Sequence, residues 1–175
     1  MIPDATDDDG HADVDRFADF MRALAPPPQL PQNNDAQAGH ARFDAIGCAG
    51  CHVETLTTAA NPSSFVPATT GGVPISTTVN ALLANQTFQP FSDFLLHDMG
   101  ALGDGITSDA AGPTLMRTAP LWGIRARSRF LHDGRAETIT DAITLHAGQG
   151  AAAAAAFQGL SPRQQQQVID FLNTI

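Results

Sequence analysis

Apolar residues recur at helical spacing in the first part of the chain. Between Asp13 and Ala25 one helical face carries most of them, which predicts an amphipathic helix. The prolines at 26–28 end this helix, because proline removes a backbone hydrogen bond and clashes with the preceding turn. Residues 29–36 predict a polar linker, and residues 39–48 predict a second helix. The apolar face of the first helix comprises Val14, Phe17, Ala18, Met21 and Leu24.

Capping signals predict the helices near the C-terminus. Thr138, followed three residues later by Asp141, resembles a capping box with aspartate in place of the usual glutamate. Its apolar face comprises Ile139, Ala142, Ile143 and His146, and Gly148 is a natural stop.

The last helix begins at Ser161. Pro162 suits the first helical position, and Gln164 completes a capping box. Alanines 151–156 predict a short helix before it, which serves packing. The apolar stripe of the last helix comprises Val168, Phe171, Leu172 and Ile175.

The middle of the chain is organised differently. Residues 57–78 are rich in Thr, Ser, Pro, Gly and Ala and predict a long surface loop. The fold class is therefore mostly α. We expect residues 1–35 to form an N-terminal helix with a proline-rich linker, and residues 36–175 to form the main domain.

Composition restricts the function classes. The chain has 175 residues and a net charge of −9, which disfavours nucleic acid and favours a basic partner protein. No run of about 18 apolar residues occurs, so no membrane span is expected. Met1 leads into the acidic stretch 7–9 rather than a signal peptide, so we expect a processed or truncated chain.

The pentad Cys48-Ala-Gly-Cys51-His52 is the attachment signal for c-type haem. Its two thiols add to the haem vinyl groups, and His52 ligates the iron from one face. Phe43, upstream of the pentad, would cover the haem edge, and Gly39 would permit close helix packing. Haem c is attached outside the cytoplasm, so we expect a periplasmic or otherwise extracytoplasmic protein.

Other uses of two cysteines fit the sequence less well. A structural zinc site needs four ligands, and no second cysteine pair completes one. A thioredoxin-like pair belongs in a βαβ setting, which the flanking sequence does not resemble. A simple disulfide is the third alternative.

Together with the pentad, three further stretches carry a family resemblance. The chain resembles the C-terminal haem domain of the di-haem oxidoreductase, or thiol oxidoreductase-like, family, which is related to bacterial cytochrome c peroxidases. The matching stretches are 46–53, 92–100, 117–123 and 132–136.

This resemblance implies a cytochrome c-like helical domain with long loops around one covalently bound haem, in which the first and last helices cross. Such relatives carry two haems, one that reacts with peroxide and one that receives electrons. This chain has a single pentad and matches the electron-receiving half.

The sixth iron ligand has two candidates. His146 stands where the peroxidase relatives carry their distal ligand, and it would give bis-histidine iron. Met99 is the alternative, because methionine is a common partner of histidine in cytochromes c. Either ligand would block peroxide from the iron, and methionine would give the higher reduction potential.

Weaker expectations concern other groups. Arg117 and Trp122 could contact the haem propionates, through charge-assisted bonds and the indole N–H. Carboxylates could hold calcium, as in the related peroxidases. These calcium candidates are Asp93, Asp98 and Asp104.

The sequence therefore predicts a mono-haem c-type cytochrome that carries single electrons outside the cytoplasm. Its partner would be a basic redox protein or a subunit bearing the other haem, and it could form an oligomer. The first alternative is a fragment or subunit of a di-haem peroxidase that reacts with peroxide at the haem. The second is a haem-based sensor or structural subunit.

Overall fold

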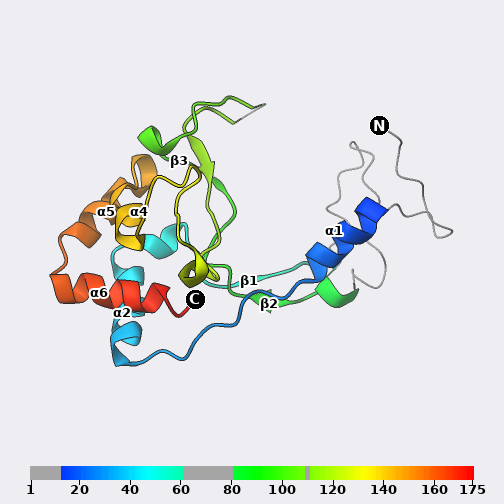
Figure 1. The fold of residues 1–175 in the computed structure, drawn as a ribbon, viewed down its shortest axis with the longest axis horizontal. Coiled ribbons are helices and arrows are strands. Elements are labelled where there is room, and N and C mark those ends of the chain that lie inside the picture. The colour runs from blue at the N-terminus through cyan, green and yellow to red at the C-terminus, as the bar shows by residue number, and fades with distance from the viewer. Residues whose placement is uncertain (1–12, 61–80, 109–110) are drawn as a thin grey trace. The chain divides into compact units, whose positions relative to one another are not determined.

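The structure is a computed structural model that describes residues 13–60, 81–108 and 111–175 (Figure 1). The chain forms two compact units. The first comprises Met1–Pro26 and Leu56–Phe88, and the second comprises Pro27–Thr55 and Gln89–Ile175. The first unit thus includes a segment beyond the 1–35 range expected from the sequence. Most of the predicted loop at 57–78 lies outside the described residues.

Among its described residues, the first unit contains helix α1, Asp13–Ala23, a helical segment at 81–83 and one small sheet. Helix α1 confirms the predicted helix and ends two residues earlier than expected, ahead of the prolines. Three residues of the predicted apolar stripe are exposed rather than packed, namely Phe17 at 65%, Met21 at 51% and Leu24 at 51%. Strand β1, Leu56–Thr57, pairs with the antiparallel strand β2, Thr87–Phe88.

Helices dominate the second unit, as predicted. They are α2, Asn34–Ala45; α4, Ile139–Thr144; α5, Ala151–Gln158; and α6, Pro162–Leu172. Both capping boxes are present, at Thr138 and at Ser161. Within the described part of the chain, no helix is long and apolar enough to cross a membrane.

Helices α2 and α6 cross in close contact (Figure 1). At the crossing, a Cβ atom added to Gly39 would lie 1.8 Å from the backbone oxygen of Gln167, so only glycine fits. The core gathers around this crossing, and the predicted stripe of α6 is buried in it. The buried members are Phe43, Phe91, Ile124, Phe157, Val168, Phe171, Leu172 and Ile175.

Two local expectations were wrong, and one element was missed. Helix α2 begins at Asn34, inside the predicted linker, because the side chain of Asn33 caps it by accepting from the backbone N–H of Ala36. Helix α4 ends at Thr144, so His146 follows the helix rather than lying within it. A hairpin of β3, Leu96–Asp98, and β4, Leu115–Arg117, was not predicted.

Candidate haem site

The second unit encloses a cavity of about 440 Å³, within the usual range for cofactor and ligand pockets. Its walls come from the end of α2, the pentad, the β3–β4 hairpin, the 117–132 segment and the helices α4 to α6. Of the haem-binding candidates proposed from the sequence, all but one line this cavity. They are Cys48, Cys51, His52, Met99, Arg117 and His146.

The pentad turns sharply as it leaves α2. Gly47 has a φ of 93°, a left-handed conformation that favours glycine, and it opens the short 3-10 turn Cys48–Gly50. The backbone N–H of His52 then donates to the oxygen of Cys48 at 2.9 Å. One turn of chain therefore presents both thiols and the imidazole to the same cavity.

The two cysteines are free thiols with suppressed acidity. Burial raises the pKa of Cys48 to about 11, and burial also raises the pKa of Cys51. Disulfide oxidoreductases need the opposite, a thiol with a lowered pKa. This environment argues against a thioredoxin-like pair and fits thiols held for addition to a bound group.

The ring of His52 is fixed in the form that a metal ligand needs. Its Nδ1 donates to the backbone oxygen of Phe91 at 2.9 Å, which leaves Nε2 available. Burial lowers the pKa of His52 to about 4, so the ring is neutral at pH 7. A neutral imidazole anchored through its other nitrogen is the usual state of a metal-bound histidine.

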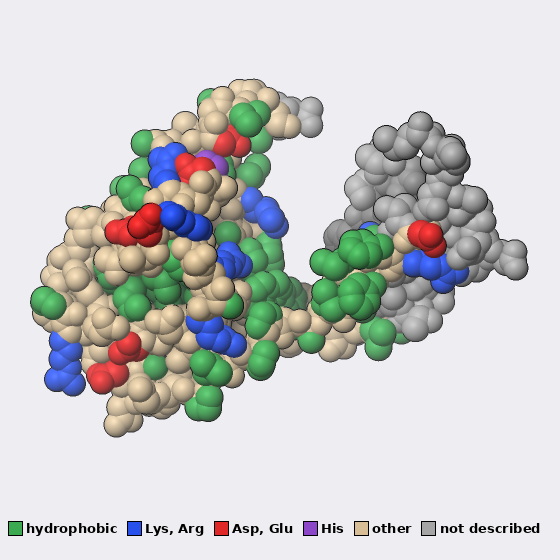
Figure 2. All heavy atoms as spheres, in the orientation of Figure 1, with side chains coloured by type: hydrophobic (Ala, Val, Ile, Leu, Met, Phe, Trp, Pro, Cys, Tyr) green, Lys and Arg blue, Asp and Glu red, His purple; other side chains and the backbone are tan. Residues whose placement is uncertain are grey.

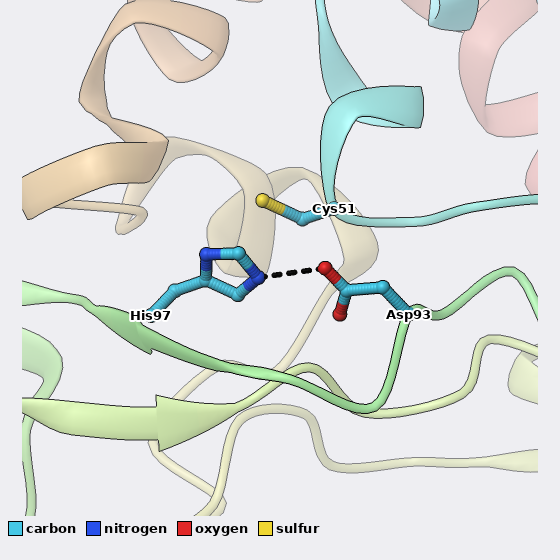
Figure 3. A group of neighbouring side chains, drawn as sticks. All are labelled: Cys51, Asp93 and His97. Atoms are coloured by element: carbon cyan, nitrogen blue, oxygen red, sulfur yellow. Dashed lines mark hydrogen bonds and ion pairs between the residues drawn. The ribbon is translucent and has the colours of Figure 1, made fainter.

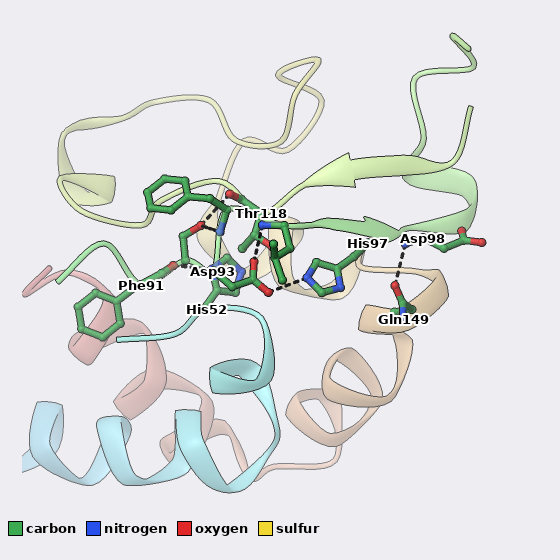
Figure 4. A network of polar contacts seen from close by, with 10 residues as sticks. His52, Phe91, Asp93, His97, Asp98, Thr118 and Gln149 are labelled. Carbon is green, nitrogen blue, oxygen red and sulfur yellow. Dashed lines mark hydrogen bonds and ion pairs between the residues drawn. The ribbon is translucent and has the colours of Figure 1, made fainter. Parts of the chain in front are cut away.

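A short segment clamps the pentad from the other side (Figure 4). Besides the Phe91 carbonyl, the N–H of Ser92 donates to the oxygen of Val53 at 2.8 Å, and the N–H of Asp93 donates to the oxygen of Cys51 at 2.9 Å. Residues 91–93 therefore fasten residues 51–53 through three successive hydrogen bonds.

The side chain of Ser92, fully buried, braces this clamp. Its hydroxyl donates to the backbone oxygen of Thr118 at 2.8 Å and accepts from the backbone N–H of Phe94 at 2.9 Å. Phe91 itself has a φ of 50°, an unusual conformation for a bulky residue. The clamp thus holds Phe91 in a strained conformation, in which its carbonyl meets the His52 ring.

His146 lines the same cavity as His52. Its Nδ1 donates to the backbone oxygen of Ala142 at 2.7 Å, which again leaves Nε2 available. The two ring centroids are 6.4 Å apart. A metal between two imidazoles, with bonds of about 2 Å and each nitrogen roughly 1.2 Å from its ring centroid, needs centroids roughly 6.4 Å apart.

Met99 reaches the same region as His146. A Cβ atom added to Gly150 would lie 3.1 Å from Cδ2 of His146 and 3.2 Å from Cε of Met99. Both sequence candidates for the sixth ligand therefore lie on one side of the cavity. His146 differs from Met99 in that a hydrogen bond to a backbone oxygen fixes its side chain.

The chain matches the family described as "di-haem oxidoreductase, putative peroxidase" over residues 4–175. It belongs to the di-haem oxidoreductase family. No curated protein and no solved structure matches it. Membership in the di-haem oxidoreductase family gives the chain a haem-related redox function.

The residues present fit the haem that the di-haem oxidoreductase family implies. An apolar cavity next to two thiols, lined by two imidazoles that each donate from Nδ1 to a backbone carbonyl, offers each contact that a covalently attached haem needs. The chain supplies one attachment pentad for this purpose.

Of the two candidates for contact with the haem propionates, one lines the cavity and the other does not. Arg117 lines the cavity, with its guanidinium 5.8 Å from the centroid of the Phe94 ring. Trp122 is half-buried and does not line the cavity. Two further arginines, Arg127 and Arg129, line it and were missed. The signal available in the sequence was the density of arginines after position 116.

Calcium is not supported by the described residues. Asp98 and Asp104 close local turns, by accepting from the N–H groups of Gly100 and Ile106. The metal-competent cluster in the described chain joins Asp93 to Cys51 and His97, all within 4.8 Å (Figure 3). Calcium takes oxygen ligands, and this cluster offers only one carboxylate.

Proposed function

We propose that this di-haem oxidoreductase family member is a mono-haem c-type cytochrome domain that carries single electrons. The observation that carries the proposal is the pair of His52 and His146, whose rings lie close together in one cavity. Each ring donates from Nδ1 to a backbone carbonyl, and the ring separation of 6.4 Å suits one metal between them.

Each group has a defined task in this proposal. Cys48 and Cys51 would hold the haem through thioether bonds, and His52 and His146 would ligate its iron through Nε2. The haem, when bound, supplies one-electron ferric–ferrous chemistry. The buried side chains of Phe43 and Leu172 line the cavity and exclude water, which keeps reorganisation small during electron transfer.

The proposal also covers location and partner. Covalent haem attachment takes place outside the cytoplasm, so the chain would work in the periplasm or an equivalent compartment. A chain that holds one haem needs a redox partner, such as a subunit that bears another haem. This arrangement would separate the two haem sites of the family onto two chains.

The second candidate function is reaction with peroxide, which the family description favours. It requires an open iron face. His146 lies where the distal face would be, with its ring fixed by Ala142. The geometry therefore supports electron transfer better than peroxide chemistry.

The experiment compares the haem-loaded protein with His146→Ala and Met99→Leu. We expect the parent and Met99→Leu proteins to be low-spin in absorption and electron paramagnetic resonance spectra. His146→Ala should acquire a high-spin component that binds azide. If Met99→Leu becomes high-spin and His146→Ala stays low-spin, methionine is the ligand and the histidine assignment fails.

A further inference from the structure

Charge is distributed unevenly along this acidic chain. The net charge is −9, yet five of its nine cationic residues fall within residues 117–135. That segment has a single carboxylate, Asp133. The five cationic residues are Arg117, Arg125, Arg127, Arg129 and Arg135. A partner would meet this local field, rather than the overall charge, at close range, because salt screens charges beyond about 10 Å.

Three of these arginines gather at the haem cavity. Arg117, Arg127 and Arg129, here called the arginine rim, all line it, and all three are exposed. Figure 2 shows arginine side chains beside hydrophobic side chains on the visible face of this unit. The cavity therefore opens onto a cationic surface.

Most of the rim charge is not neutralised within the chain. Arg129 pairs with Glu137 at 2.6 Å, and both side chains are well exposed. Among the described residues, no carboxylate forms an ion pair with Arg117 or Arg127. The rim is consequently positive, although the chain as a whole is negative.

An apolar patch adjoins the rim on the β3–β4 hairpin. Leu95 is 61% exposed and Leu96 is 52% exposed. Leu96 is the register partner of Arg117 across the two strands. Exposed apolar side chains beside arginines have the composition of a protein–protein interface.

We propose that the arginine rim and the adjoining leucines dock an acidic redox partner protein at the haem cavity. This inference rests on the proposed electron-transfer function and names the chemistry of the partner. The overall negative charge favours a basic partner, whereas the positively charged rim favours an acidic one. The electron leaves or enters at the cavity, where docking brings the two redox centres closest.

The test uses small redox probes of opposite charge on the haem-loaded, ferrous protein. Ferricyanide takes one electron and becomes ferrocyanide, while tris(phenanthroline)cobalt(III) takes one electron and becomes the cobalt(II) complex. We expect the ferricyanide rate constant to fall about tenfold between low and high salt, because screening removes the attraction. The cobalt rate constant should rise over the same range.

Matched variants locate the effect. Arg117→Gln/Arg127→Gln should lose most of the salt dependence. Arg42→Gln/Arg163→Gln, which changes the net charge equally at residues that do not line the cavity, should retain it.

Three results overturn the inference. In the first, ferricyanide reacts faster as salt rises. The surface around the cavity is then negative, and it would attract a basic partner rather than an acidic one. In the second, the rim variant shifts the reduction potential but keeps the salt dependence, so these arginines serve the haem propionates. In the third, both double variants lose the salt dependence equally, so no local docking field exists. A protein without a haem spectrum would instead count against the proposed function.

Discussion

Replacing Ser92 with alanine should weaken the support of His52, the proposed proximal ligand. Ser92 is fully buried, and its hydroxyl satisfies the Thr118 carbonyl and the Phe94 N–H. The Ser92→Ala variant leaves both groups without this partner. Each unsatisfied buried group costs about 1–3 kcal/mol, so we expect a stability loss of about 2–6 kcal/mol. For a chain of this size, that corresponds to a melting temperature lower by roughly 4–24 °C.

The same substitution should also change the reduction potential of the haem. The clamp holds the Phe91 carbonyl against Nδ1 of His52, and this hydrogen bond makes the ring a stronger electron donor. A looser carbonyl weakens that donation, which disfavours the ferric state. If the ferric state loses about 1 kcal/mol of stabilisation relative to the ferrous state, the reduction potential rises by about 40 mV.

The assay combines thermal melting with a spectroelectrochemical titration of the haem-loaded protein. Ser128→Ala, at an exposed position, is the matched control and should change neither quantity. A Ser92→Ala protein that melts early but keeps the parent potential would refute the link between the clamp and His52. One that melts with the parent would refute the clamp itself.

Other changes test the fold and the attachment. Cys48→Ala/Cys51→Ala should let the haem be extracted by acid and organic solvent, whereas the parent retains it; equal extraction from both would contradict covalent attachment. Gly39→Val should cost at least about 3 kcal/mol in denaturant unfolding, because its Cβ would lie 1.8 Å from a backbone oxygen. A stability within about 1 kcal/mol of the parent would contradict the helix crossing. Thr138→Ala should lose about 1 kcal/mol through the capping box, while a loss of the low-spin spectrum would show that the cap also governs His146.

The helices could be predicted from the sequence because their signals are local. The helix start needs only Ser161, Pro162 and Gln164 in order. The structure confirms this helix, with Ser161 as its N-cap and Pro162 as its first residue. The close approach at Gly39 was also predictable, because a glycine facing a crossing helix leaves room for the backbone.

The contacts that join distant segments could not be predicted. The hairpin strands β3 and β4 have three residues each, too few for an alternating pattern to appear. The partner of His52 is a backbone carbonyl at Phe91, and a carbonyl has no sequence signature. Trp122 was proposed as a propionate contact because of its indole N–H, although the presence of a donor does not fix which side chain faces the cavity.

The most direct test of the account is the visible spectrum of the purified protein, ferric and then ferrous, before and after peroxide. The account predicts a low-spin haem c spectrum in both oxidation states, with a ferric form that peroxide leaves unchanged. A high-spin ferric component that reacts with peroxide would contradict the proposed ligand pair of His52 and His146, and would favour peroxide chemistry at an open iron face.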